Sequence, residues 1–391
     1  MIRTICAALL VLGSVLVAAS LAFSPLLVRS SHPLWHDDSA QGGRLVVRAG
    51  LPLLELSGSP AERGRQQGAL VGGVAHDLLG FMNLPTQLSI KRSRTFVDGC
   101  VGAIHAEDRD ELVALAAASG ISVDSLLRTH AIIETMCSAV VHTGPEGTRF
   151  GRNMDFPPAD ALGATTVLTV VREPGRHTYA SVTWPGMIGV VSGMNDRGLA
   201  TCILLNWHGK PAGPGEPLPL RARRILQECG DVDAALTLFS SEPLGSAHYL
   251  LIADPHRAVL AWRDASGLHC DMPTNGWLFV DNKSRAGGIA TGERACALEA
   301  AAHALGHNAP DFPWYRRATT TSYMKFQNTQ AMAFDCAAQR IELGRGTTLL
   351  PAALAPWVGI DLTALLGGAA LNTAQVERLP APTPMRHWRE R

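Results

Sequence analysis

Cys137 is the residue whose type and setting best suit covalent chemistry. It stands where a helical pattern ends and a strand-like alternation begins, in CSAVVHT at residues 137–143. A thiol at the start of a strand is expected at the rim of a sheet, where a substrate can reach it. Because the thiolate is the nucleophilic form of cysteine, this position predicts nucleophilic catalysis.

A charged segment, GRNMDF at residues 151–156, follows Cys137 after a tight turn at residues 144–147. A hairpin with this turn folds the second strand beside the first, so we expect Arg152 and Asp155 near the thiol. A guanidinium lowers the pKa of a thiol, and a carboxylate holds an amine or orients the arginine. The alternatives are an ordinary buried cysteine and a structural ion pair.

Two asparagines follow later predicted strands. Asn206 ends the strand predicted over 199–206, and Asn282 comes directly after the strand predicted over 277–281. Their amide groups are candidate donors to a developing oxyanion, where one donor lowers a barrier by about 3 kcal/mol. The alternative is that both residues only form turns.

The spacing of His303 and His307 on a predicted helix is one that zinc sites use. No third ligand and no HExxH context accompany the pair, so solvated histidines at a helix end are the better interpretation. We expect no metal and no cofactor.

A mixed set of elements must position these groups. Residues 60–130 have helical spacing, and from Met136 the period changes to two. Helical stretches at 220–229, 232–239 and 293–305 separate later hairpins, and a Pro-rich loop covers 210–219. Antiparallel hairpins alternating with helices predict an α+β layered fold, with helices packed on two sheets. The predicted hairpins span residues 137–156, 165–184, 190–206, 249–262 and 323–343.

The first segment predicts export. Arg3 precedes the uncharged apolar run 5–23, which suits a signal peptide and is almost long enough to span a bilayer. We therefore expect residues 1–28 to be a cleaved signal peptide or a membrane anchor. The remainder would then be periplasmic or extracellular, or tethered to the membrane with the catalytic part outside the cytoplasm.

The charge balance argues against nucleic acid as a partner, and the cysteine count bears on disulfide formation. The 391 residues include 34 Lys+Arg and 34 Asp+Glu, so no basic excess favours nucleic acid. Seven cysteines lie beyond the leader, and an odd number in an exported protein predicts one free thiol. The other six are either paired in an order that the sequence does not give, or buried as thiols.

Together these segments resemble a known family. Cys137, GRNMDF and the segment GMNDRGLATCILLNW at 193–207 are similar to the cysteine N-terminal-nucleophile (Ntn) hydrolases. GSPAERGRQQGALVG at 58–72 most resembles the branch of the acyl-CoA:6-aminopenicillanate acyltransferases, peptidase family C45. Relatives include choloylglycine hydrolases, acid ceramidase and N-acylethanolamine amidase. The likeness runs from about residue 57 to 343, most of the chain.

The resemblance implies a four-layer αββα sandwich of two antiparallel sheets between helical layers. It also implies a precursor that cuts itself before Cys137, whose freed α-amine then serves as general base with a pKa of about 7.7–8.0. Residues 29–136 would be a helical pro-region or small subunit, residues 137–378 the catalytic core, and residues 379–391 a polar tail.

The family's site residues transfer by position. Arg152 and Asp155 match the Arg and Asp of its RNxD motif, Asn206 matches the asparagine of its LN strand, and Arg294 matches a later active-site arginine. Asn282 follows Asp281, where the family usually has Thr-Asn. The nucleophile is followed by Ser138, where threonine is common.

The resulting hypothesis is an exported, self-processing enzyme that hydrolyses the C–N amide bond of a small N-acyl substrate through an acyl-cysteine. The first alternative is an acyltransferase that moves the acyl group to an amine acceptor. The second, from a different class, is an uncut and inactive family member acting as an envelope binding protein. The expected partners are the N-acyl substrate, the second processed piece and, through residues 5–23, a membrane.

Overall fold

The computed structural model describes residues 35–89, 94–131, 135–284, 292–306, 308–367 and 376–385. The predicted leader and His307 lie outside the described residues. Within those ranges, no helix is both long and apolar enough to cross a membrane.

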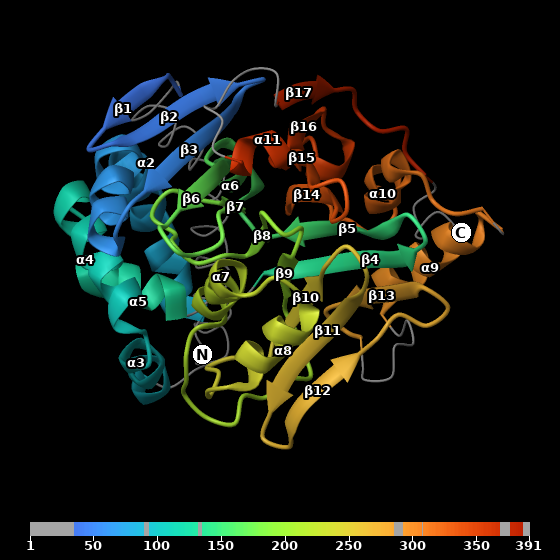
Figure 1. The fold of residues 1–391 in the computed structure, drawn as a ribbon, viewed down its shortest axis with the longest axis horizontal. Coiled ribbons are helices and arrows are strands. Elements are labelled where there is room, and N and C mark those ends of the chain that lie inside the picture. The colour runs from blue at the N-terminus through green and yellow to red at the C-terminus, as the bar shows by residue number, and fades with distance from the viewer. Residues whose placement is uncertain are drawn as a thin grey trace, which may run out of the picture.

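Two β-sheets form the centre of the molecule (Figure 1). In spatial order, the larger sheet contains β1 (Asp38–Ala40), β2 (Gly43–Arg48), β3 (Leu51–Ser57), β6 (Val167–Arg172), β7 (Tyr179–Thr183), β8 (Ser192–Asn195), β9 (Ala200–Leu204), β10 (Tyr249–Ala253), β11 (Ala258–Asp264) and β12 (Gly267–Asp271). The smaller sheet contains β13 (Trp277–Asp281), β4 (Met136–Gly144), β5 (Gly147–Asp155), β14 (Asn328–Asp335), β15 (Arg340–Arg345), β16 (Trp357–Asp361) and β17 (Val376–Leu379).

The helical pattern predicted over 60–130 divides into four helices. Gly120 ends the third of these with a φ of 74°, a left-handed conformation that glycine adopts readily. The helices are α2 (Pro60–Ser89), α3 (Arg94–Gly102), α4 (Ala106–Ser119), α5 (Val123–Ala131), α6 (Ala159–Ala164), α7 (Leu218–Glu228), α8 (Val232–Ser240), α9 (Glu293–His303), α10 (Phe312–Thr319) and α11 (Leu362–Leu366), with a 3₁₀ turn, η1, at Ala352–Leu354.

Strand β4 shows how the layers form. Ala139 and Val141 belong to an apolar core shared with strands of the larger sheet, whereas Val140 packs with residues of α9 and α10. Alternate side chains of a strand point to opposite faces, so β4 has one face toward each layer. On the larger sheet, α2 covers β2 and β3, α7 covers β8 and β9, and α8 covers β10 and β11. The predicted layered α+β fold is confirmed.

The N-terminal segment departs from the expectation of a purely helical pro-region. Strands β1, β2 and β3 precede its helices, and β3 pairs in parallel with β6, with Leu53 opposite Leu168. The larger sheet is therefore not wholly antiparallel. The run Leu51–Ser57 is almost continuously buried and lacks the alternation that marks a half-exposed strand, which is why its pattern gave no prediction.

Of the two expected alternatives, disulfide pairs or buried thiols, most of the cysteines follow the second. None of the seven from Cys100 to Cys336, all in described parts of the chain, is disulfide-bonded, and five of them are buried. Cys270 and Cys296 are the exposed ones.

Candidate active site

The hairpin of β4 and β5 brings Cys137 and Arg152 to one face of the smaller sheet. Cys137 lies opposite Met154, and Arg152 lies opposite Ala139. Nη2 of Arg152 is 2.9 Å from Sγ of Cys137, and both side chains are buried. Nη1 of Arg152 donates to Ser192 Oγ on β8. The guanidinium thus joins the two sheets and places a positive charge against the sulfur.

The thiol itself is covered. Cys137 is 0% exposed, although its place at the start of a strand predicted an accessible rim. Both Oγ1 and the carbonyl oxygen of Thr135 lie 3.4 Å from Sγ, and the carbonyl oxygen of Ile203 lies 3.6 Å from it. Thr135, two residues before the cysteine, and Ile203 of β9 therefore shield its sulfur.

Asp155 lies on the other face of β5, because it is three residues from Arg152 and successive side chains alternate. It pairs with Arg294 of α9, whose Nη1 is 2.6 Å from Oδ2. Its Oδ1 accepts from the backbone N–H of Met324 at 3.1 Å and from Nδ2 of Asn328 at 2.9 Å. Burial raises the pKa of Asp155, and the charge of Arg294 opposes that shift. Asp155 orients an arginine, but Arg294 and not Arg152.

Arg294 links the separate parts of the site. Its Nη2 donates to the carbonyl oxygen of Cys137 at 2.8 Å and to Oδ1 of Asn282. The same Oδ1 accepts from the backbone N–H of Cys137 at 2.9 Å. Arg294 and Asn282 therefore fix the backbone on both sides of the Cys137 Cα, while Asp155 fixes Arg294.

Asp281 positions the helix that carries Arg294. Its Oδ2 accepts from the N–H groups of Arg294 at 3.0 Å and Ala295 at 3.2 Å, in the first turn of α9. A carboxylate at a helix N-terminus is stabilised by the unpaired N–H groups there. An aspartate where the family usually has threonine thus has a structural reason in this chain. A Cβ at Gly292 would lie 1.9 Å from Oδ1 of Asp281, so glycine is required at that position.

Asn206 does not contact Cys137 directly, but its neighbours are tied to Asn282. Nδ2 of Asn282 donates to Leu205 O at 2.8 Å, and the N–H of Trp207 donates to Asn282 O at 3.0 Å. Oδ1 of Asn206 accepts from two backbone N–H groups in the following turn. Its Nδ2 donates to no residue that the structure describes, so an amide donor remains available.

A cavity of about 360 Å³ lies where these segments meet. Asn206 and Ser284 line it, together with Tyr249 and Trp262, whose rings meet edge to face at 5.3 Å. Tyr249 Oη donates to Ser284 O at 2.7 Å, which fixes the chain two residues beyond Asn282. The Pro-rich loop 210–219 contributes no residue to the lining of this cavity. Of the site residues that the sequence predicts, Asn206 lines this cavity, whereas Cys137 and Arg152 do not.

Several contributors carry no signal in the sequence. Asn328 of β14 is fully buried and reaches Asp155 across 173 residues of chain. Ser192 contacts Arg152 because the two sheets pack together, whereas Thr135 is only two residues from the sulfur that it contacts. Burial raises the pKa of Cys202, a second thiol near Arg152, to about 11, so that thiol stays protonated.

In the described part of the chain, one cluster of side chains could supply metal ligands, but the guanidinium of an arginine lies between them. Ligand atoms of His105, Glu216 and Glu242 lie within 4.8 Å of one another. Nη1 of Arg224 is 2.8 Å from His105 Nε2 and 3.3 Å from both carboxylates. A guanidinium already neutralises these acids, so they do not fit a metal ion. His303, at the end of α9, is exposed.

Two sheets between helices, with a cysteine–arginine pair at a strand start, are the arrangement that the resemblance to Ntn-type amide hydrolases and acyltransferases predicts. The family model of the acyl-coenzyme A:6-aminopenicillanic acid acyl-transferases matches residues 142–273, about a third of the chain. The resemblance to this family that the motifs predicted is thereby confirmed. No curated protein matches the sequence.

Three solved structures are similar at low identity. An ortholog of N-acylethanolamine-hydrolyzing acid amidase from Caenorhabditis elegans is 16% identical, with a TM-score of 0.45, covering 51% of this chain and 93% of its own. Penicillin V acylase from Agrobacterium tumefaciens is 12% identical, with a TM-score of 0.39, covering 64% and 100%. A variant of conjugated bile acid hydrolase from Clostridium perfringens is 10% identical, with a TM-score of 0.42, covering 64% and 99%.

Proposed function

We propose that the chain is a self-processing amidohydrolase in which Cys137 is the nucleophile and cleaves the C–N bond of a small N-acyl amide. The observation that carries the proposal is the contact between Arg152 Nη2 and Cys137 Sγ at 2.9 Å. A guanidinium in this position can stabilise the negative charge that develops on the sulfur as it attacks a carbonyl carbon.

Self-processing explains why the thiol is covered. Sγ of Cys137 attacks the carbonyl carbon of Met136, the C–N bond breaks as the nitrogen takes the thiol proton, and water hydrolyses the thioester. The products are a carboxylate on Met136 and an α-amine on Cys137. Thr135, which shields the sulfur, then belongs to a separate chain end and is free to leave the site.

The α-amine forms where it is needed. In the uncut chain the nitrogen of Cys137 already donates to Oδ1 of Asn282, and Arg294 holds the following carbonyl. After cleavage the same nitrogen takes the thiol proton as Sγ attacks a substrate amide, and returns it to the departing amine. It then activates the water that hydrolyses the acyl-cysteine, as an amine with a pKa near neutral can.

The oxyanion of the tetrahedral intermediate needs a donor, and Asn206 supplies one. Its Nδ2 is free of partners among the described residues, and Asn206 lines a cavity of about 360 Å³ that could admit a substrate. Because Asn282 uses its Oδ1 on Cys137 N and its Nδ2 on Leu205 O, it acts as a positioning residue and not as an oxyanion donor.

The remaining parts of the proposal concern placement in the cell. The apolar run 5–23 after Arg3 supports export, as a cleaved leader or as a membrane tether. After cleavage before Cys137, the two pieces would stay together through the pairing of β3 with β6 and the contacts of α5 with α7. The ion pairs of Arg63 with Glu173 and of Glu111 with Arg223 also join them.

The test compares purified wild type with Cys137→Ala and with Cys229→Ala, which removes a buried thiol at the end of α7. Wild type and Cys229→Ala should each give two bands on a denaturing gel, the larger about two-thirds of the chain and beginning Cys-Ser-Ala-Val-Val. Both should hydrolyse members of a panel of penicillins, bile-salt conjugates, N-acyl amino acids, N-acylethanolamines and homoserine lactones. A single full-length band from active protein would refute processing, and activity in Cys137→Ala would remove the nucleophile.

Acyl transfer is the second candidate function, because the matched family model is that of acyltransferases. An amine acceptor added to the assay would then give an N-acyl product in place of the free acid. An uncut wild type without activity on any substrate would instead support the envelope binding protein.

A further inference from the structure

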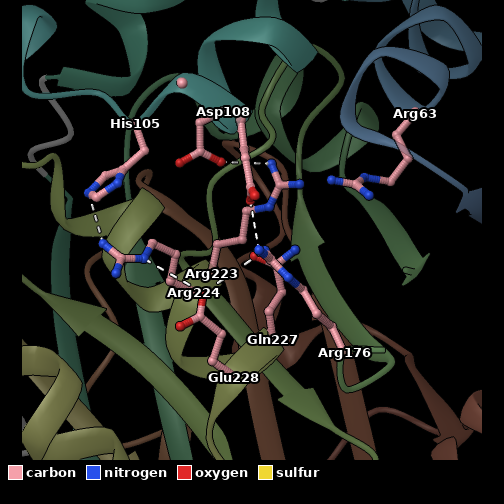
Figure 2. A pocket seen from close by; sticks show the side chains of 10 residues that line it. Arg63, His105, Asp108, Arg176, Arg223, Arg224, Gln227 and Glu228 are labelled. Carbon is pink, nitrogen blue, oxygen red and sulfur yellow. Dashed lines mark hydrogen bonds and ion pairs between the residues drawn. The ribbon is translucent and has the colours of Figure 1, made fainter. Parts of the chain in front are cut away.

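A second cavity lies on the helical side of the larger sheet, apart from the cysteine site. Its volume is about 270 Å³, and α2, α4, α7 and the turn between β6 and β7 form its walls (Figure 2). Four arginines line it: Arg63, Arg176, Arg223 and Arg224. Glu107, Asp108 and Glu228 line it too, and Glu111 and Glu173 pair with arginines of its wall.

The buried arginines of this cavity share their counter-ions. A single oxygen, Oε2 of Glu111, accepts three hydrogen bonds. Two come from Nε and Nη2 of Arg63, at 3.1 and 2.8 Å, and one comes from Nη2 of Arg223, at 2.5 Å. Arg63 also pairs with Glu173 at 3.1 Å. One carboxylate oxygen thus serves two guanidinium groups, and the rest of the Arg223 fork needs other acceptors.

Arg223 lacks those acceptors among the described residues. It is 1% exposed, yet its Nε and Nη1 donate no hydrogen bond. Oδ1 of Asp108 lies 3.3 Å from Nη1 but outside hydrogen-bonding geometry. Burial raises the pKa of Asp108 to about 6, which weakens it further as a counter-ion in mild acid. A buried cation with free N–H groups is costly unless an acceptor reaches it.

We propose that this cavity binds a small polar molecule through an oxyanion, a carboxylate or a phosphate, with Arg223 at its base and Arg176 at its mouth. Arginine is the side chain best suited to such groups, because its planar fork matches their oxygens. The cavity is far larger than a bare ion needs, so the ligand carries a polar body beyond the anionic group. Arg176 is a quarter exposed and pairs with Glu107 at 2.8 Å, so the ligand's anionic group would have to compete with that exposed carboxylate.

The location gives the site a second property. Arg63 and Asp108 precede residue 137 in the chain, whereas Arg176, Arg223 and Arg224 follow it. A ligand held by both sets bridges the N-terminal segment and the catalytic part. Its binding does not depend on the chemistry at Cys137, so the two proposals succeed or fail separately.

The test measures binding of inorganic phosphate and of succinate by calorimetry and by thermal shift, with chloride added to equal ionic strength in every sample. Wild type should bind at least one of the two saturably, and the tighter one identifies the ligand's anionic group. Arg176→Gln should weaken binding about tenfold or more. The matched control Arg257→Gln, which removes an exposed arginine paired with Asp233, should leave binding unchanged.

Two further measurements keep the result decisive. Gln227→Leu, at the cavity wall, should also weaken binding, while amide hydrolysis by all three variants stays at the wild-type rate. Absence of saturable binding by either anion in wild type would show that water fills the cavity and would overturn the proposal. Equal affinities in wild type and Arg176→Gln would overturn it as well.

Discussion

His130 gives the sharpest test of the link between the N-terminal helices and the larger sheet. It is fully buried on α5, where its Nδ1 donates to Leu126 O at 2.8 Å and its Nε2 accepts from the N–H of Ile188 at 2.9 Å. Burial lowers the pKa of His130 to about 4. Protonation would place a second donor against the Ile188 N–H, so the folded protein requires the neutral ring.

The sign and size of the effect follow from linkage. The unfolded chain binds the proton with a pKa of about 6.5, so stability from neutral His130 is present above that pH and is lost as pH falls toward 4. This group alone costs about 2 kcal/mol at pH 5 and about 3 kcal/mol at pH 4. With an unfolding entropy of about 2.1 cal/mol/K per residue over roughly 350 residues, 2 kcal/mol corresponds to about 3 °C in Tm.

The assay is the difference in Tm between His130→Gln and its parent, both carrying Cys137→Ala so that the chain stays uncut, at constant ionic strength. Glutamine does not titrate, so its deficit at pH 7.5 should shrink by about 3 °C at pH 5. His303→Gln, at an exposed histidine, should show a difference that does not change with pH. A His130→Gln difference that is the same at pH 7.5 and pH 5 would refute the reasoning.

Three further predictions concern other groups. Arg152→Met should lower kcat/KM about 100-fold and slow alkylation of Cys137 by iodoacetamide, because the sulfur loses its guanidinium; unchanged alkylation would contradict the role. Asn206→Leu should lower kcat about 10²–10³-fold with little change in KM, as steady-state kinetics would show, because an oxyanion donor acts in the transition state. Asp108→Asn tests a pH dependence of stability that is opposite in sign to the one predicted for His130. The raised pKa of Asp108 stabilises the fold at low pH, so wild type should lose about 2 kcal/mol relative to the variant from pH 4 to pH 7.5, measured as a Tm difference.

Local pattern predicted the hairpin that carries the site. The turn at residues 144–147 and the alternation on both strands place Cys137 beside the second strand, and the same alternation puts Arg152 on the face of the thiol. The same alternation places Asp155, three residues after Arg152, on the opposite face of the strand. The expectation that both charged residues flank the sulfur overlooked their odd spacing.

Contacts between distant segments could not be predicted. Arg294 meets Asp155 across 139 residues, and Asn328 meets it across 173, because the order of strands in the smaller sheet places β14 beside β5 and α9 over β4. Nothing in the local sequence specifies that order. The arginine-lined cavity is hidden for the same reason, since its charges come from three helices and a turn.

The proposed cut would turn Cys137 from an internal residue into a chain end, and the contacts of Cys137 show how its position would be kept. The groups that hold Cys137, namely Asn282 at its nitrogen, Arg294 at its carbonyl oxygen and Arg152 at its sulfur, all follow the proposed cut in sequence. Of the two residues whose oxygens lie against the sulfur, Thr135 precedes the cut and Ile203 follows it. The proposed hydrolysis before Cys137 would separate Thr135 from the site and leave the holding contacts within one piece. The site would then be assembled before the cut, so the proposed processing would require no refolding of the smaller sheet.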